Sequence, residues 1–323
     1  MEFSGYELDI EKAREELDEM GARSILLQVP DGLIRKAGRI LEEIGLNGAI
    51  WGGTCYGACD LPQDIGDADA LVHVGHSEIP NLDVDYPVVY IEAWAVRFAD
   101  IPQELFERLE GKVGLYSTVQ YRKHLDKVKN ALEEEGFDVL IEEGDDRIKY
   151  PGQILGCNYS AIAKGADSHL YIGSGRFHPI GLSLVSGANV VIFNPSTGEV
   201  SETGELADKM LRKRHAAITA SQDKMEESDK YIGVIVSTKG GQKRMKMAEN
   251  IAAEDDRVKI IVFDEIIPSR VDSMDLCCVV NTACPRIALD DSIRFKTTIL
   301  TPVEFEILKG KIDWDNWSVD QIS

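Results

Sequence analysis

The segments DADALVHVGHS (67–77) and GADSHLYIGSG (165–175) share one pattern, and this pattern decides the fold. Each opens with an Ala-Asp pair, continues as a short run rich in apolar residues, and ends in a glycine followed by small or polar residues. A run of this length bounded by turn residues is typical of a strand buried in a sheet. Two copies far apart in one chain predict that the chain repeats a structural unit.

Strand and helix patterns repeat in the same order around these copies, and a third repeat follows them. In each repeat a buried strand precedes an amphipathic helix, and further strands follow; the first strands cover 22–30, 111–121 and 230–241. Strands that alternate with helices at these lengths predict α/β domains with parallel sheets joined by right-handed crossovers. A long helix is expected over 201–224, between the second repeat and the third.

The repeats predict three similar domains, each with about four strands and three helices. Their expected boundaries are 1–110, 111–224 and 225–323. In open parallel sheets, binding and catalytic groups collect at the carboxyl ends of the strands. We therefore look for functional residues in the loops that follow strands.

The composition is that of a globular protein with a strongly acidic charge balance. Hydrophobic residues make up 44% of the chain, and 35 Lys+Arg against 56 Asp+Glu give a net charge of −21. An acidic surface repels phosphate backbones, which argues against nucleic-acid binding. One basic segment, KMLRKRH (209–215), is either a solvated helix face or a docking patch for a partner or an anionic ligand.

The chain shows no sign of a membrane span or a secretion signal. No apolar run reaches the roughly 18 residues that a transmembrane helix needs. Residues 1–21 are acidic with a helical pattern and lack the basic start and apolar core of a signal peptide. We expect a cytoplasmic protein without a membrane partner.

Six cysteines in a cytoplasmic chain are not expected to form disulfides. Cys277 and Cys278 are expected inside an apolar strand, where cysteine acts as a small hydrophobic residue. Each repeat also places one cysteine near a strand end; these are Cys59, Cys157 and Cys284. Cys55 shares a loop with Cys59 and is a ligand, a neighbouring thiol or a core residue.

Three thiolates from three domains suit a soft metal centre. A 4Fe–4S cluster commonly takes four cysteines, so three would leave one iron open to substrate. Spacing alone leaves a second interpretation open, in which the three cysteines are unrelated core residues.

Three motifs resemble the archaeal 2-(3-amino-3-carboxypropyl)histidine synthases, the family that begins diphthamide synthesis: TCYGACDLPQDIGDADALVHVGHSEIP (54–80), GQILGCN (152–158) and NTACPRIALDD (281–291). The resemblance covers nearly the whole chain. It implies a homodimer in which three αβ domains in pseudo-threefold arrangement surround a central 4Fe–4S cluster held by Cys59, Cys157 and Cys284. Cys55 has no assigned role in this family, and the CxxxCxxC signature of other radical S-adenosylmethionine enzymes is absent.

The resemblance also implies a reaction. One electron from the reduced cluster cleaves the Cγ–S bond of S-adenosylmethionine, which gives methylthioadenosine and a 3-amino-3-carboxypropyl radical. The radical adds to C2 of one histidine imidazole in translation elongation factor 2. The implied partners are therefore this protein substrate, a one-electron reductant and a second copy of the chain.

Five further residues are candidates for contacts with S-adenosylmethionine. Arg286 suits its carboxylate and Asp290 its ammonium, although an Arg–Asp surface pair on a helix is the alternative. Gln242, in STKGGQ, is a candidate hydrogen-bond donor or part of a plain turn between strand and helix. Gly173 and Ser174, in GSGRFHP, either cradle the adenosine or form a turn that serves the fold.

His73 and His76, in LVHVGHS, are candidates for acid–base work or for receiving the substrate histidine. Structural histidines with satisfied hydrogen bonds are the alternative. Two other functions also compete with the transferase: a quinolinate-synthase-like 4Fe–4S dehydratase and a non-catalytic accessory subunit that carries the cluster. A zinc-stabilised binding protein would need four nearby ligands, which the sequence does not supply.

Overall fold

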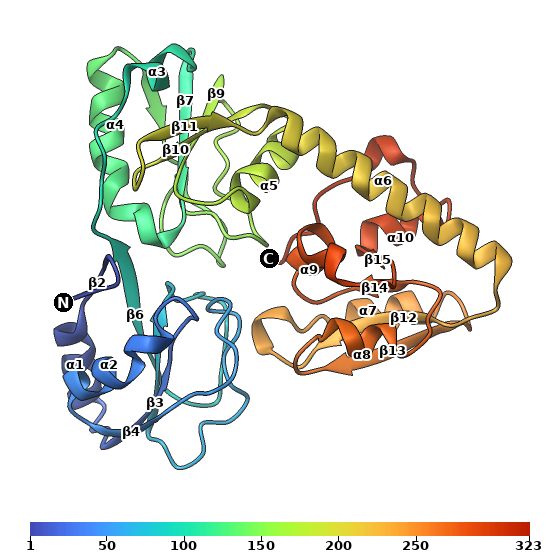
Figure 1. Cartoon of the computed structure of the whole chain (residues 1–323), viewed down its shortest axis with the longest axis horizontal. Helices are drawn as coiled ribbons and strands as arrows, with labels where there is room; N and C mark the ends of the chain where they lie inside the picture. The colour runs from blue at the N-terminus through green and yellow to red at the C-terminus, as the bar shows by residue number, and fades with distance from the viewer. The chain divides into compact units, whose positions relative to one another are not determined.

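A computed structural model describes residues 1–323, and its strands form three sheets. Four adjacent parallel strands make up the whole third sheet and most of the other two, in which they reach one edge. Counted along the chain, these four strands have the spatial order second, first, third, fourth in every sheet. The chain is therefore an α/β protein with several parallel-sheet repeats, as predicted (Figure 1).

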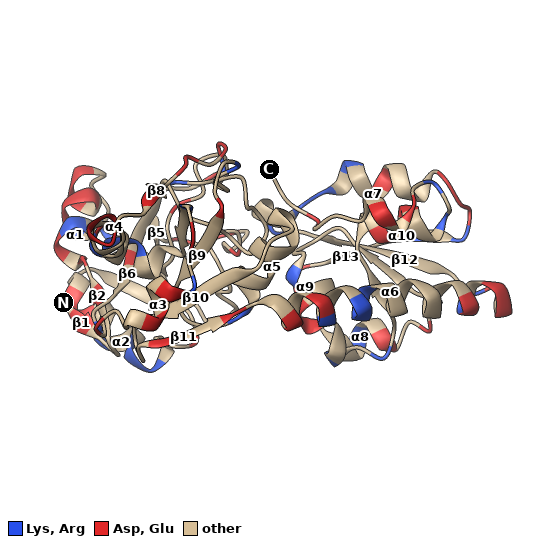
Figure 2. Cartoon of the chain, turned by 90° about the horizontal axis from the view of Figure 1, so that it is seen from above, with Lys and Arg blue, Asp and Glu red and all other residues tan.

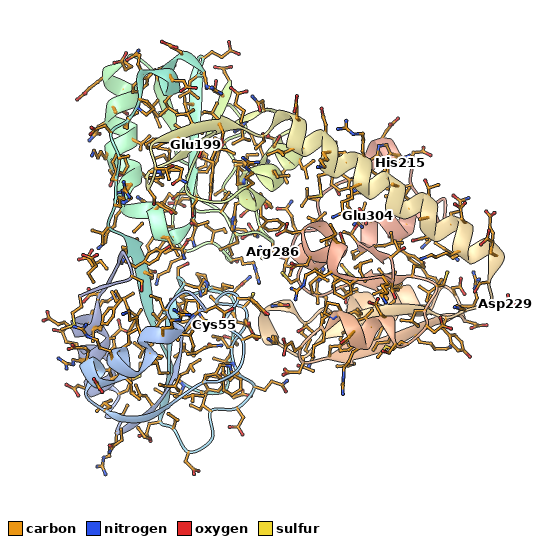
Figure 3. All side chains as sticks on the ribbon, in the orientation of Figure 1. Cys55, Glu199, His215, Asp229, Arg286 and Glu304 are labelled. Atoms are coloured by element: carbon orange, nitrogen blue, oxygen red, sulfur yellow. The ribbon has the colours of Figure 1, made fainter.

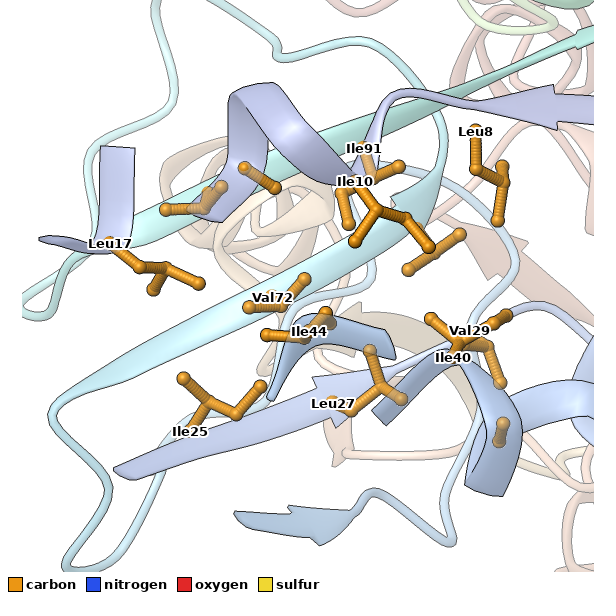
Figure 4. Packing of buried hydrophobic residues seen from close by; sticks show 14 of the residues in the cluster. Leu8, Ile10, Leu17, Ile25, Leu27, Val29, Ile40, Ile44, Val72 and Ile91 are labelled. Atoms are coloured by element: carbon orange, nitrogen blue, oxygen red, sulfur yellow. The ribbon is translucent and has the colours of Figure 1, made fainter. Parts of the chain in front are cut away.

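The first sheet has the order β1-β2-β6-β5-β3-β4. Its strands are β1 (Glu2–Phe3), β2 (Tyr6–Leu8), β3 (Ser24–Gln28), β4 (Asn47–Ile50), β5 (Ala70–Gly75) and β6 (Val88–Ala95). Its helices are α1 (Ile10–Glu19), η1 (Ile34–Lys36) and α2 (Ala37–Ile44). Apolar side chains from α1 and α2 pack against the sheet and form one core with residues of β3, β5 and β6 (Figure 4).

The second sheet has the order β11-β10-β9-β7-β8. Its strands are β7 (Lys112–Ser117), β8 (Asp138–Leu140), β9 (Ser168–Ile172), β10 (Val190–Asn194) and β11 (Glu199–Glu202). The helices along this part of the chain are α3 (Gln103–Glu107), η2 (Val119–His124), α4 (Leu125–Glu134) and α5 (Phe177–Ser186).

The third sheet has the order β13-β12-β14-β15. Its strands are β12 (Ile232–Ser237), β13 (Val258–Phe263), β14 (Val279–Asn281) and β15 (Ile299–Leu300). The helices are α6 (Gly204–Glu227), η3 (Gly240–Gln242), α7 (Met245–Ala252), α8 (Pro268–Asp272), α9 (Arg286–Leu289), η4 (Asp291–Arg294), α10 (Pro302–Leu308) and η5 (Trp314–Asn316). The predicted long helix is α6, and acidic residues flank its basic segment 209–215 (Figure 2).

Several local predictions were wrong. Residues 1–21 do not form one helix, because Ser4 and Gly5 adopt positive φ and turn β1 back onto β2. The sheets are not purely parallel, since β1 and β2 in the first and β11 in the second add antiparallel strands at an edge. Helix α5 was not predicted, and Cys277 and Cys278 come just before β14 rather than inside it, although both are buried as expected.

The chain divides into two compact units. The first comprises Met1–Leu155, Ser160–Gly175 and Ala188–Glu202, and the second comprises Gly156–Tyr159, Arg176–Gly187 and Thr203–Ser323. The first unit holds the first two sheets, while the second holds the third sheet together with α5 and the short segment around Cys157. The boundaries of three separate domains stay a prediction. No helix combines the length and apolarity required to cross a membrane.

Candidate metal centre

The three predicted ligand cysteines all follow strands of the repeats. Cys59 lies between β4 and β5, and Cys157 lies between β8 and β9, so both come between the second and third parallel strands. Cys284 follows the third parallel strand, β14, so its position in the repeat differs from that of the other two. None of the three forms a disulfide; Cys157 is buried, and the other two are partly exposed.

A buried amide connects the Cys59 loop to the first sheet. Gln28 ends β3 and is fully buried. Its Nε2 donates to the carbonyl oxygens of Thr54 (2.8 Å) and Asp60 (2.7 Å), and its Oε1 lies 2.7 Å from Nδ1 of His73 on β5. The two carbonyl acceptors fix the orientation of the amide, so the Cys59 loop is positioned from the adjacent first and third parallel strands.

The same bonds fix the tautomers of His73 and His76. Because Oε1 of Gln28 only accepts, Nδ1 of His73 carries the proton. Nε2 of the neutral ring then accepts from Nδ1 of His76, at 2.9 Å. Burial lowers the pKa of His73 well below its usual value and the pKa of His76 to about 4, a shift that the charge of Asp60 partly opposes. Both rings are thus neutral near pH 7, and His76 keeps an unprotonated Nε2.

Asp60 closes a turn that contains Cys59. Its Oδ2 accepts from the backbone N–H of Tyr56 at 2.9 Å, and its Oδ1 accepts from Oγ1 of Thr54 at 3.2 Å. The backbone N–H of Asp60 donates to the carbonyl of Gly57. Because these bonds connect Asp60 to residues that precede Cys59, they fix the loop on both sides of Cys59.

Cys55, which is labelled in Figure 3, belongs to the first unit. It lies beside the two histidines. One ligand atom from each of Cys55, His73 and His76 falls within 4.8 Å of the others, a donor set that soft metals accept. The N–H···N bond between the rings already uses the facing nitrogens of the two imidazoles, however. Tyr90 packs against His73 with ring centroids 5.5 Å apart, and burial raises its pKa, with smaller contributions from Glu78, Tyr86 and Cys59.

The Cys284 loop is shaped by its own strand. Nδ2 of Asn281 donates to the carbonyl of Cys284 at 2.9 Å, and the backbone N–H of Ala283 donates to Oδ1 of Asn281 at 3.2 Å. Thr282 continues the strand pairing with two bonds to the carbonyl of Ile235 on β12. This loop therefore leaves the sheet where β12 and β14 are neighbours.

Arg286 and Asp290 bind each other. Nε and Nη2 of Arg286 lie 3.0 and 2.9 Å from Oδ2 of Asp290, on side chains that are 52% and 40% exposed. The guanidinium also lies over the ring of Phe177, 5.1 Å from its centroid. Nearby, burial and then Arg286 lower the pKa of His178 to about 4, against the opposing charge of Asp290. A contact of either residue with S-adenosylmethionine stays a prediction, and it requires this pair to open.

The other predicted contacts follow strands of the sheets, in different units. Gly173 and Ser174 follow β9 in the first unit, where Gly173 is buried and Ser174 exposed. Gln242 ends η3 in the second unit and is 8% exposed. Their positions follow the expected rule for parallel sheets, while their roles stay predictions.

The chain matches the family model described as "Putative diphthamide synthesis protein" over residues 29–318. It is also 35% identical to 2-(3-amino-3-carboxypropyl)histidine synthase of Pyrococcus horikoshii, across 94% of this chain and 91% of that protein. The chain belongs to the diphthamide synthesis protein family. The protein of the same name from Methanocaldococcus jannaschii is 28% identical, across 94% of this chain and 89% of that protein.

Solved structures of this family share the fold. The crystal structure of Dph2 from Pyrococcus horikoshii with a 4Fe–4S cluster has a TM-score of 0.87 and 34% identity, with 98% of this chain and 94% of that chain covered. The resemblance stated from the motifs is thereby confirmed, and the quinolinate-synthase-like alternative is wrong.

The residues of this chain fit an iron–sulfur cluster by their chemistry. Cys59, Cys157 and Cys284 offer three thiols, one in a loop after a strand of each sheet, without disulfides. Sequence reasoning missed the residues that fix these loops, namely Gln28 at the end of a strand and, as described below, Arg244 and Asp320. Polar residues inside apolar strand patterns, such as Gln28 in ILLQVP, were the available signal.

Proposed function

We propose that this chain is a 2-(3-amino-3-carboxypropyl)histidine synthase. It moves the 3-amino-3-carboxypropyl group of S-adenosylmethionine to C2 of a histidine imidazole in translation elongation factor 2. The C2–H bond is replaced by a C–C bond, and methylthioadenosine leaves. The adduct loses a proton and the one electron that the cleavage consumed, so the net reaction is redox-neutral. One observation carries this proposal. A chain with one thiol in a loop of each repeat matches, over nearly its full length, a family structure that holds a 4Fe–4S cluster.

Cys59, Cys157 and Cys284 are the proposed ligands of the 4Fe–4S cluster. When bound, the cluster supplies the electron for reductive cleavage of the Cγ–S bond and an iron with an open position. The residues around Cys59 add no positive charge, since His73 and His76 are neutral. Gln28, whose amide is hydrogen-bonded to His73, binds the carbonyls of Thr54 and Asp60 and so holds the loop in one conformation before substrate binds, which lowers the cost of positioning.

Arg286, Asp290, Gln242, Gly173 and Ser174 are the proposed contacts to S-adenosylmethionine. Arg286 is suited to the carboxylate because its guanidinium is half-exposed and already stacked on Phe177. Exchange of its present partner, Asp290, for the substrate carboxylate would release Asp290 toward the substrate ammonium.

The proposed function sets the partners. The protein substrate is elongation factor 2, a one-electron reductant recharges the cluster, and two copies of the chain form the active dimer. Because the proposed substrate is a translation factor, we expect the enzyme in the cytoplasm. A net charge of −21 fits protein recognition better than nucleic-acid binding.

The test is made on anaerobically purified, reconstituted full-length protein. With dithionite, S-adenosylmethionine and elongation factor 2, we expect methylthioadenosine and a factor heavier by one aminocarboxypropyl group, both detected by mass spectrometry. Cys59→Ala, Cys157→Ala and Cys284→Ala should each abolish both products, whereas Cys55→Ala should retain them. Formation of 5′-deoxyadenosine in place of methylthioadenosine would contradict the proposed bond cleavage. An intact cluster with neither product would favour the accessory-subunit alternative.

A further inference from the structure

The segment around residue 320 binds the backbone of the Cys157 loop. The N–H of Ile322 donates to the carbonyl of Cys157 at 2.8 Å. Nδ2 of Asn158 donates to the carbonyl of Ile322 at 3.0 Å, and the N–H of Tyr159 donates to Oε1 of Gln321 at 2.9 Å. Three consecutive residues of the loop are thus hydrogen-bonded to two consecutive residues of this segment.

Arg244 connects the same segment to the Cys284 loop. Its Nη1 and Nη2 donate to Oδ1 and Oδ2 of Asp320, at 2.7 and 2.6 Å. Its Nε and Nη2 also donate to the carbonyls of Thr282 (2.7 Å) and Ala283 (3.1 Å), the two residues before Cys284. The side chains of Arg244 and Asp320 are only 12% and 5% exposed, so water competes little with this bidentate pair.

We propose that residues 320–322 and Arg244 form a brace that sets the position of Cys157 relative to Cys284. The proposal rests on the proposed function, because it takes both cysteines as cluster ligands. A cluster accepts thiolates only at defined separations, and sites that are loose by about 1 Å lose function. The brace acts on backbone groups of Cys157, Thr282 and Ala283, and it therefore fixes where each loop presents its cysteine.

The brace joins loops from different repeats. The Cys284 loop is also organised by bonds within its own sheet, through Asn281 and Thr282, and these bonds do not reach the Cys157 loop. Loss of the ion pair would leave the fold of each loop unchanged, but the distance between Cys157 and Cys284 would no longer be fixed. Arg244 and Asp320 are in this sense positioning residues, which act through the two loops.

The test compares cluster retention in full-length variants. Asp320→Ala and Arg244→Ala remove the ion pair, and Asp320→Asn keeps the shape and part of the hydrogen bonding. The matched control is Asp255→Ala, which breaks an ion pair with Lys309 (2.9 Å) in the same unit without a contact to either loop. Iron content after reconstitution, the rate of cluster loss to a ferrous chelator, the electron paramagnetic resonance spectrum of the reduced cluster and the melting temperature are measured for each.

We expect Asp320→Ala and Arg244→Ala to lose the cluster about 10-fold faster than wild type, the lower end of the effect typical for residues that orient ligands. The spectra of their reduced clusters should broaden or shift. Asp320→Asn should lose the cluster at a rate between those of wild type and Asp320→Ala. Asp255→Ala should match wild type in rate and spectrum, even if its melting temperature falls as much as that of the other variants. If the alanine variants do not fold, Gln321→Ala, which removes one bond to Tyr159, should show a smaller change of the same sign.

Wild-type retention and spectra in Asp320→Ala and Arg244→Ala would overturn the brace while leaving the proposed function intact. A wild-type protein that takes up no cluster, or Cys157→Ala and Cys284→Ala variants that keep it unchanged, would overturn the ligand assignment and the brace together.

Discussion

The Cys59 loop and the two other cysteine loops are held by different kinds of buried polar group. In the first unit, one amide and two neutral imidazoles from neighbouring strands hold the Cys59 loop. In the second unit, ion pairs have this role: Arg244–Asp320 connects the Cys157 and Cys284 loops, and Arg214–Glu304 is more deeply buried, with side chains 1% and 0% exposed.

This difference predicts which changes destabilise each unit. A neutral network costs less to bury than charges do, but it weakens when any one hydrogen bond is lost or when a proton is added. A buried ion pair tolerates no removal of a single partner, because the remaining charge is left in a medium that solvates it poorly. The two units should therefore respond differently to mutation and to acid.

The largest expected effect is that of Arg214→Ala. Arg214 donates to both carboxylate oxygens of Glu304 and to the carbonyls of Ala288 and Ile299. Its removal leaves Glu304 charged and buried, which should lower the free energy of unfolding of the second unit by about 3–5 kcal/mol. Hydrogen exchange of α6 and α10 amides in increasing urea measures this. Arg286→Ala, which breaks an exposed pair, is the control and should cost about 0–1 kcal/mol; equal losses would contradict the comparison.

A smaller loss is expected for Gln28→Leu in the neutral network. Two loop carbonyls and the Nδ1–H of His73 lose their partner, and the first unit should lose about 2–3 kcal/mol of unfolding free energy. Urea denaturation followed by exchange of the β3 and β5 amides gives the value. Gln222→Leu, on the exposed face of α6, should change little. A Gln28→Leu effect as small as this control would mean that the network does not hold the loop.

Mild acid should weaken the first unit more than the second. Burial lowers the pKa of four histidines in the first unit, His73, His76, His124 and His169, and of His178 alone in the second. At pH values between the unfolded pKa near 6.5 and the lowered pKa values of the folded state, the unfolded chain binds more protons than the folded chain. The stability these groups contribute is therefore complete above about pH 6.5 and falls as the pH drops toward 4.

Hydrogen exchange at pH 7 and pH 5, corrected for the intrinsic pH dependence of exchange, should show this loss in β3 and β5 before β12 and β14. His76→Gln should flatten the pH dependence of the first unit. Equal acid sensitivity of the two units would mean that the neutral network is not the source of the difference.

The smallest effect is expected for Cys55→Ala. Cys55 is 7% exposed beside the imidazole pair and is not a proposed cluster ligand. We expect a loss of about 1 kcal/mol, typical of a single buried substitution, with iron content after reconstitution equal to wild type. Iron loss comparable to that of Cys59→Ala would make Cys55 a ligand and would revise the site.

Sequence patterns predicted the fold where the signal is local. Runs such as ALVHVG and IGVIVS read as strands because buried parallel strands are apolar along their whole length, and both are β-strands here. The hairpin at residues 2–8 escaped prediction because its strands are too short to show a period, and only a turn with positive φ defines it. Family motifs then gave the three cysteines, which spacing alone did not separate from core residues.

The sequence by itself determined the repeats, their strand order along the chain and the strand ends that carry cysteines, because these depend on residues close to one another. The tertiary structure alone decided which polar groups meet. Gln28 and His73 are 45 residues apart, and Arg244 and Asp320 are 76 apart, so no local pattern records that they bind. Packing of whole strands and segments brings such groups within hydrogen-bond distance, and burial then makes each contact strong and its loss costly.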